Sequence, residues 1–574
     1  MVNADTGVHT KGKHNIMGGV EFRRLTEGRA AENNPLGLFT FSAGTAGVTS
    51  TGNAAADFVT GYANQDQTPI VTVKGSVGQW RDGFFILDNW QVSQNLTLNY
   101  GLRYDLPTVP YSLNGYARIL NPAEDALIPA TDATSAKDFV PTPGFKFIGP
   151  QHDNWGPRFG FAYRATDKMV VRGGFGIYYN ANQLNSYTLA TGNYPLAATV
   201  NYNTAPGALL TFINNTPGAG SKSPVAGVQG TYVSAFTDDI HNKTQRSYQW
   251  NLSTGYEPWR GSGFELQYLG SHDSDLDRSF YDNEPLLPGP GSVNSRRPNQ
   301  LFGQIRKIEN DGWSNYNALT AILRQRTLHG LAGQISYTWS HDLDLSTDSN
   351  GGGTLSQQYN PIADYGNSNW DIRNRLVASL TYALPLLSNS NYAVRQALGG
   401  WELASIVNVQ SGTPFNVILN YNSANMSAGT ERPNFVHAPH ADCSLRNYIH
   451  GNTTSCIDTT AYALPANINA NQYAFGNTSR NTLHGPGFSY VNLSAFKTFT
   501  VVSRLSIQFR AEAFNVFNHP SAANPASSIG HDSSAIAQPT FLSVTGFGSV
   551  TGVQQVPGSV SGARVLSLAG KVVF

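Results

Sequence analysis

Strict alternation of apolar and polar side chains over short runs is the feature that most constrains this chain. In residues 96–105 (LTLNYGLRYD), every even-numbered position is apolar or aromatic and every odd-numbered position is polar or glycine. Residues 331–340 (LAGQISYTWS) and 504–513 (RLSIQFRAEA) follow the same pattern. Because successive side chains of a β-strand point to opposite faces, the pattern predicts strands with one apolar and one polar face.

The pattern recurs along the whole chain and predicts about 14 strands. They are expected near residues 13–24, 82–91, 96–105, 157–165, 169–179, 246–256, 263–270, 316–326, 331–341, 374–384, 401–411, 488–499, 504–517 and 564–574. Each is close to the ~9–11 residues that a tilted strand needs to cross a bilayer. The final run, VLSLAGKVVF, keeps its alternation up to Phe574.

The connections between these strands alternate between short and long. Short ones include VSQN, ATDK, EPWRGSG and TLHG, whereas the long ones are rich in Gly, Pro, Asn, Ser and Asp. They cover roughly residues 25–81, 106–156, 180–245, 271–315, 342–373, 412–487 and 518–563, and 385–400 is an exception of intermediate length. Short periplasmic turns and long extracellular loops are typical of outer-membrane barrels. We therefore expect an all-β, antiparallel transmembrane β-barrel with both chain ends at the periplasmic rim.

A soluble antiparallel sheet or a solenoid of stacked strands is the main alternative, because half-buried sheets also alternate. The chain shows no fixed repeat period of the kind that marks solenoids. The isolated charges on the polar faces, such as Arg103, Arg172 and Glu512, suit a water-filled lumen.

Composition and charge narrow the function classes. Only 13% of the residues are charged, and 37 basic residues balance 37 acidic ones. We expect no nucleic-acid partner, because such proteins carry a basic patch. No stretch approaches the 18 apolar residues of a transmembrane helix. The first residues, MVNADTGVHTKGKHNIMGG, lack the apolar segment and cleavage site of a signal peptide, so the chain is expected to be either cytoplasmic or a piece of a longer protein.

Motifs that carry catalysis or bind cofactors are not found. The sequence has no H-E-x-x-H, G-x-S-x-G or P-loop motif, so we expect neither an enzyme nor a cofactor. Asp342, Asp344 and Asp348 cluster without the spacing of an EF-hand, and a solvated loop is the preferred interpretation over a calcium site. We therefore predict no metal site.

The two cysteines, Cys443 and Cys456, lie in one predicted loop. They are either two unpaired thiols or a local disulfide formed in an oxidising compartment. We favour the disulfide.

The alternation of side chains between the two faces of each predicted strand identifies candidates for the lumen wall. The side chains expected on polar faces include Arg103, Arg172, Arg504, Gln508, Arg510 and Glu512. They could contact a substrate, a plug domain or each other as ion pairs, and parity alone does not separate these roles.

Several longer stretches of the chain together carry a specific resemblance. They include DIRNRLVASLTYALP, GGWELASIVNVQSGTPF, RAEAFNVFNHP, GNTSRNTLHGPGFSYVNLSAFKTF and SNYNALTAILRQR followed by GLAGQISYTWSHDLD. These stretches resemble the barrel of Oar-like TonB-dependent outer-membrane transporters. FILDNWQVSQNLTLNYGLRYD and DNWGPRFGFAYRATDKMVVRGGFGIYYN resemble earlier segments of the same barrel. The matching stretches follow the family's order over nearly the whole chain.

The resemblance implies a location in the outer membrane of a Gram-negative bacterium and a large, unidentified substrate. Family members carry a signal peptide, a β-sandwich, a plug domain that contacts TonB and a 22-stranded barrel. Residues 1–574 resemble only the C-terminal part of that barrel, so TonB would act only through a plug that this chain lacks. The other implied partners are membrane lipid and the barrel assembly machinery, for which Phe574 resembles the C-terminal aromatic signal.

Another class of function stays open beside this one. The chain could form a smaller closed barrel that acts as a passive, porin-like pore or as a surface-adhesion scaffold, because an even count of about 14 strands is allowed for bacterial barrels.

Overall fold

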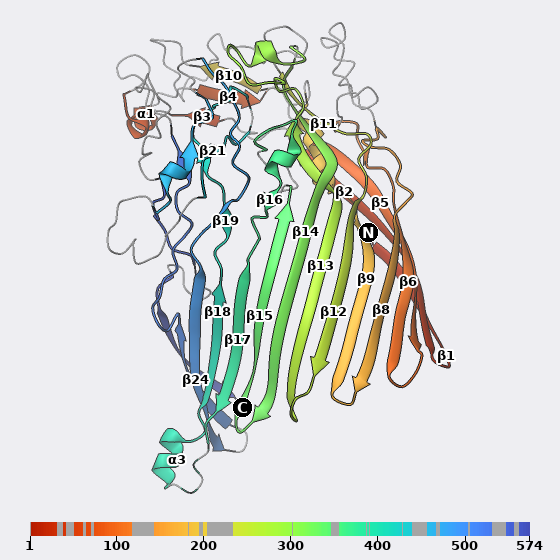
Figure 1. Cartoon of the computed structure of the whole chain (residues 1–574), viewed down its shortest axis with the longest axis vertical. Helices are drawn as coiled ribbons and strands as arrows, with labels where there is room; N and C mark the ends of the chain where they lie inside the picture. Colours follow the sequence, from red (N-terminus) through yellow and green to blue (C-terminus); the bar gives the residue numbers. More distant parts are fainter. Residues whose placement is uncertain are drawn as a thin grey trace.

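The structure is a computed structural model of the whole chain. It describes residues 2–30, 38–41, 51–60, 65–69, 74–117, 143–181, 183–193, 199–203, 233–300, 302–345, 355–385, 387, 389, 391–427, 429–438, 456–466, 471–502, 505–530, 547–555 and 562–573. Among these residues one large sheet dominates (Figure 1).

The large sheet has 18 strands among the described residues, and 15 of them are long. The long strands are β1 (Val2–Lys11), β2 (His14–Ala30), β5 (Lys74–Gln91), β6 (Leu96–Pro107), β8 (Trp155–Thr166), β9 (Met169–Asn180), β12 (Gln245–Tyr256), β13 (Ser262–Tyr281), β14 (Phe302–Leu328), β15 (Leu331–Asp344), β17 (Asn374–Ala383), β18 (Glu402–Gln410), β24 (Phe488–Val502), β25 (Leu505–Phe514) and β27 (Val565–Val573). Each pairs antiparallel with the next one in this order. The short strands β7 (Tyr111–Ser112), β11 (Val233–Asp238) and β16 (Gly366–Asn367) pair with β5, β14 and β15.

The register keeps one apolar and one polar face across the whole sheet. On the apolar face, Leu319 of β14 lies opposite Tyr268 of β13 and Trp339 of β15. Many apolar side chains on this face are exposed, including Leu252 (52%), Leu319 (42%) and Leu568 (74%). Because such a face is stable only against an apolar phase, it is the lipid-facing side of a barrel wall.

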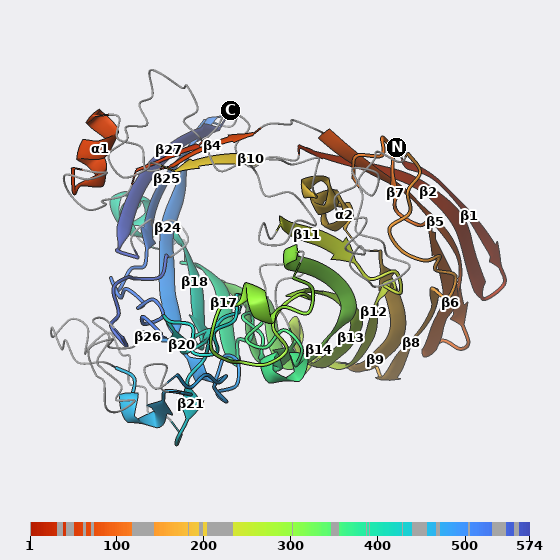
Figure 2. The same cartoon turned by 90° about the horizontal axis from the view of Figure 1, so that it is seen from above.

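The polar face lines the inside of the curved sheet. Figure 2 shows the sheet curving around an interior that holds α2 (Leu184–Thr188) and β11. Val77 of β5, which by alternation shares a face with Arg103 of β6, is fully buried against Tyr187 of α2. The polar face is therefore the concave one.

Tight turns join the strands at one end of the sheet. His329 and Gly330 between β14 and β15 both have positive φ angles, of 51° and 87°. Two positive values in a two-residue loop define a type I′ turn, whose twist matches that of the flanking strands. The connection 385–400 lies at this same end and contains α3 (Tyr392–Leu398), which the Asn391 side chain caps by accepting a hydrogen bond from the Val394 amide at 2.9 Å.

Three sequence predictions about strand layout need correction. The strand β1 was not predicted, because VNADTGVHTK has only weak alternation and every residue in it is exposed. This extra crossing places Val2 at the end of β1 away from the short turns, so the prediction of both chain ends at the periplasmic rim was wrong. The strands β5, β13 and β14 also extend well beyond their predicted bounds, into segments predicted as long loops.

The long connections gather at the opposite end of the sheet and carry the remaining elements (Figure 1). These are α1 (Ala54–Thr60), η1 (Leu189–Gly192), η2 (Asn294–Arg296), η3 (Pro361–Asp364), η4 (Thr459–Ala461), β3 (Leu38–Thr40), β4 (Gln65–Pro69), β10 (Thr199–Asn203), β19 (Pro414–Phe415), β20 (Ile418–Leu419), β21 (Asn434–Phe435), β22 (Tyr462–Ala463), β23 (Leu483–His484) and β26 (Ser528–Ile529). In the part of the chain that the structure describes, no helix is both long and apolar enough to pass through a membrane.

Candidate functional site: a polar lumen wall beneath a packed loop cap

The register places five of the six predicted lumen residues on the concave face. Arg103 and Arg172 lie on β6 and β9. On β25, Gln508, Arg510 and Glu512 lie side by side, with Arg510 and Glu512 3.7 Å apart. The structure therefore brings the β25 residues together but leaves Arg103 and Arg172 in separate places. Arg504 lies outside the described residues, and a role for any of the six in substrate contact stays a prediction.

Arg103 belongs to a charged cavity on the lumen wall near the loop end of β2, β5, β6 and β8. Its guanidinium contacts Glu21 at 3.2 Å and Asp105 at 2.8 Å. The cavity has a volume of about 180 Å³, and its charged lining consists of Glu21, Arg23, Arg81, Asp82, Arg103, Asp105 and Arg158. The sequence analysis singled out only Arg103 of this set, although strand parity could also have selected Arg158.

The long connections above the lumen form what we call the loop cap. It comprises the described residues between β13 and β14, β15 and β17, β18 and β24, and β25 and β27. The cap has its own hydrophobic core, which includes Phe415, Leu419, Ile457, Tyr462 and Ile529. Loops with a core of this kind hold a defined shape, because burial of apolar side chains offsets the entropy of ordering them.

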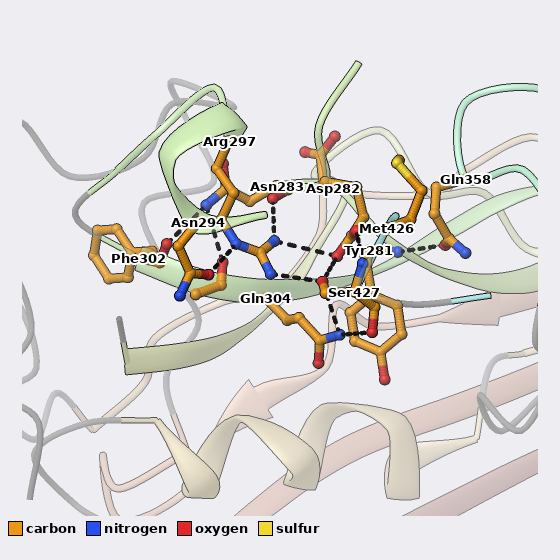
Figure 3. Close-up of polar contacts among 12 residues, drawn as sticks. Tyr281, Asp282, Asn283, Asn294, Arg297, Phe302, Gln304, Gln358, Met426 and Ser427 are labelled. Carbon is orange, nitrogen blue, oxygen red and sulfur yellow. Dashed lines mark hydrogen bonds and ion pairs between the residues drawn. The ribbon is translucent and has the colours of Figure 1, made fainter. Parts of the chain in front are cut away.

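A buried ion pair in one loop of the cap is hydrogen-bonded to Ser427 in a second loop, and Figure 3 shows Arg297 and Ser427 side by side. Glu284 and Arg297, both from the β13–β14 loop, are 3.2 Å apart and almost fully buried. From the β18–β24 loop, the Ser427 amide donates to Glu284 at 2.9 Å, and its hydroxyl accepts from Arg297 at 2.6 Å. Gln304 donates to the Ser427 carbonyl at 2.9 Å. The two loops are therefore fixed to each other by charge-assisted hydrogen bonds.

Two further buried ion pairs connect the β18–β24 loop to residues at or after the end of β15. Arg432 contacts Asp364 at 2.7 Å, and Arg480 pairs with Asp344 at the end of β15. Burial raises the pKa of Asp364, which the charge of Arg432 opposes, and burial lowers the pKa of Arg480 to about 10. The interpretation of this segment as a solvated loop was wrong for Asp344, which is 6% exposed. Asp348 lies outside the described residues.

Glu431 adds a titratable group to the cap core. Its carboxylate accepts from the Ser423 hydroxyl at 3.1 Å, and the residue is 6% exposed. Burial raises its pKa to about 7, against the opposing effect of that hydrogen bond, the Ala424 amide and Arg432. The protonation of this side chain therefore changes close to neutral pH.

Three other predicted residues are Cys443, Cys456 and Phe574, of which the structure describes only Cys456. Cys456 packs against the cap core and takes part in a disulfide, but Cys443 lies outside the described residues, so their pairing stays a prediction. Phe574 also lies outside them. The described residues contain no group of three or more His, Cys, Asp or Glu side chains arranged to hold a metal ion.

These features define a class of protein. A single antiparallel sheet has a lipid-facing apolar side, a polar concave side, tight turns at one end and a loop cap at the other, which is the architecture of an outer-membrane β-barrel wall. Residues 3–566 match the outer membrane beta barrel domain, and the chain belongs to that family. It is an outer-membrane protein of the Gram-negative type, as the sequence predicted.

This chain is similar to several solved outer-membrane proteins. The outer membrane transporter YddB from Escherichia coli matches with a TM-score of 0.50 at 10% identity, over 100% of this chain and 54% of YddB. The siderophore receptor PiuA from Acinetobacter baumannii has a TM-score of 0.44 at 8% identity, over 100% and 55% of the two chains. The FrpB iron transporter from Neisseria meningitidis has a TM-score of 0.43 at 12% identity, over 99% and 55%.

This chain therefore spans about half the length of the solved proteins that it matches. No curated protein sequence matches it. At 10% identity the likeness to the outer membrane transporter YddB concerns the fold alone.

Proposed function

We propose that this chain is the C-terminal part of the barrel of an Oar-like TonB-dependent transporter. It binds a large substrate at the loop cap and passes it along the polar lumen. The observation that carries the proposal is the combination of a continuous polar concave face with a cap whose loops are locked together above it. A receptor surface needs such preorganised loops, because ordering them on binding would cost affinity.

The strand pairing supports a larger complete barrel, for which the family resemblance implies 22 strands. Within the described residues, β1 pairs only with β2, and β27 pairs only with β25. Barrels remove such edges by closure, since an exposed edge offers unpaired backbone groups. In the complete protein, a plug domain would link the lumen to TonB, and the role of this chain is transport rather than catalysis. Phe574 would serve recognition by the barrel assembly machinery.

Planar-bilayer recording on the refolded full chain tests this proposal against the smaller barrel. We expect no steady conductance, because an open sheet cannot enclose a stable pore. A long-lived open channel would favour the passive, porin-like barrel and would contradict the proposal.

A cellular test addresses the active step. In a bacterium that encodes this chain, deletion of its gene should abolish growth on or uptake of the substrate to the same extent as loss of TonB. Uptake that persists without TonB would argue against a TonB-dependent transporter, and an unchanged surface-adhesion phenotype would exclude the adhesion scaffold.

A further inference from the structure

Arg158 of β8 differs from Arg23 and Arg103, two other arginines of the lumen cavity, in its partners. Arg23 pairs with Glu21, and Arg103 contacts both Glu21 and Asp105. For Arg158, the structure records neither an ion pair nor a hydrogen bond with any described residue, and its Nε is buried without a partner. The Asp105 carboxylate interacts with the charge of Arg158 but accepts its hydrogen bond from Arg103 Nε, at 2.8 Å.

The side chain of Arg158 is nevertheless held in place. Its guanidinium carbon lies 4.6 Å from the ring centre of Tyr178 of β9. Tyr178 can lie flat because Gly176 faces Arg158 in the register, and a Cβ at Gly176 would come within 2.9 Å of the Tyr178 ring. Stacking uses the face of a guanidinium and leaves the N–H groups at its edge available.

The local charge balance favours an anion. Four arginines and three acidic residues line the cavity, which leaves an excess of one positive charge. Gly83 contributes to the same arrangement, because a Cβ there would lie 2.4 Å from Arg103 Nη2. The missing side chain lets Arg103 reach across β5 to Glu21, so the acidic groups are drawn to Arg103 and Arg23 rather than to Arg158.

The space beside Arg158 fits a small oxyanion. The cavity of about 180 Å³ is larger than a phosphate or a short carboxylate, and Asn180 and Thr244 line it with polar groups. On the other side of Arg158, a second cavity of about 290 Å³ is lined by Asn99, Gln249 and Asn251. Amide side chains can donate to the remaining oxygens of an anion that the guanidinium holds by its edge.

We propose that Arg158, stacked on Tyr178, binds an oxyanionic group, a carboxylate or phosphate of a small solute, at the lumen wall. Arg158 is the ligand-binding residue, and Tyr178 is a positioning residue. The inference concerns binding by this chain and does not depend on the proposed transport function.

Ligand-observed NMR on the refolded full chain tests the site, with inorganic phosphate and succinate as probes. We expect saturable broadening of the phosphate signal and its reversal by succinate. Arg158→Gln should weaken binding by about tenfold or more, because hydrogen bonds to charged groups are the stronger kind. Arg158→Lys should show an intermediate loss, since a lysine keeps the charge but not the planar fork.

Matched variants distinguish specific binding at Arg158 from a nonspecific effect of positive charge on the lumen wall. Arg164 lies on the same strand and the same face as Arg158, but it donates to Asn95 at 2.8 Å outside the cavity. Arg164→Gln should therefore bind phosphate as the unmodified chain does. Tyr178→Phe should keep binding because the ring remains, whereas Tyr178→Leu should weaken it.

Three outcomes would overturn the proposal. These are no saturable binding of either probe, equal binding by Arg158→Gln and the unmodified chain, or an equal loss in Arg164→Gln. Heat-modifiable migration on gels verifies that each variant has refolded. If Arg158→Gln does not refold, Arg158→Lys still decides the result, because unchanged affinity in that variant excludes recognition by the guanidinium fork.

Discussion

The carboxylate of Glu284 and the guanidinium of Arg297 lie 3.2 Å apart, with 0% and 3% of their side-chain surfaces exposed. Ser427, which is 143 residues away from Glu284 in the sequence, donates to the same carboxylate. This ion pair is therefore one of the contacts that hold two extracellular loops together, beside the hydrogen bonds that Asn425 donates to Gly289 and Gly291. Its removal should therefore change loop dynamics well away from the substituted residue.

Glu284→Ala should loosen the contact between the β18–β24 loop and the β13–β14 loop. Removing one partner leaves the other charge buried and uncompensated, which costs about 3–5 kcal/mol. Hydrogen–deuterium exchange should show faster exchange in residues 421–427, on the other loop. The double variant Glu284→Ala, Arg297→Ala should lose less than the sum of the two single variants, because it leaves no lone charge.

An exposed ion pair provides the control. Glu265 and Arg324 are 2.8 Å apart, and the Arg324 side chain is 52% exposed. Glu265→Ala should cost at most about 1 kcal/mol and leave exchange in the cap unchanged. Equal exchange in Glu284→Ala and the unmodified chain would contradict the assigned role of the buried pair.

The two faces of the sheet should respond oppositely to a new charge. Leu323 of β14 lies on the apolar face opposite Phe264 and Ile335, and it is 37% exposed. Leu323→Arg should destabilise the refolded chain by about 2–4 kcal/mol if it lies near the bilayer midplane. Thr320→Arg, on the polar face of the same strand, should have little effect. Urea titration in lipid vesicles measures both, and equal midpoints would contradict the assignment of the faces.

The sequence was sufficient to predict the wall of the barrel because alternation is a local signal. A strand such as 96–105 must place every second side chain in lipid, so the pattern itself carries both the strand and its parity. That parity placed Arg103 and Arg510 on the polar side without knowledge of any neighbour. The same reasoning missed β1, whose alternation rests on only three apolar side chains, Val2, Ala4 and Val8.

The cap could not be predicted in this way. Its loops show no alternation of apolar and polar side chains. The contacts that shape it join residues far apart in the sequence, such as Arg480 and Asp344, which are separated by 136 positions. The aspartates of residues 342–348 were interpreted as solvated because nothing nearby in the sequence indicates a partner for Asp344. The sequence also could not indicate that Arg158 is available to bind an anion, because this depends on which acidic groups the other arginines pair with.

The cap should loosen as the pH rises through neutrality, because of Glu431. Its pKa of about 7 lies above the ordinary value of 4.5, so the folded cap holds the proton more tightly than the unfolded loop. The stabilisation is complete below pH 4.5 and is lost as the pH rises to about 7, by on the order of 3 kcal/mol at 1.4 kcal/mol per pKa unit.

Hydrogen exchange at residues 417–432, corrected for the intrinsic effect of pH, measures this change. Protection should fall between pH 5 and pH 8 in the unmodified chain. Glu431→Gln mimics the protonated side chain and should stay protected over the whole range. A fall of the same size in Glu431→Gln would assign the effect to another group.

The last prediction concerns the two cysteines of the β18–β24 loop. If Cys443 and Cys456 form a disulfide, the refolded chain should not react with iodoacetamide until a reductant is added. The bridge closes a short loop of 14 residues, counting both cysteines, for which the chain-entropy relation gives about 3 kcal/mol of stabilisation. Cys456 packs against the cap core, so reduction should increase proteolysis at residues 456–466 and leave the membrane strands intact. Immediate labelling of both thiols in the refolded, unreduced chain would show that the cysteines are unpaired.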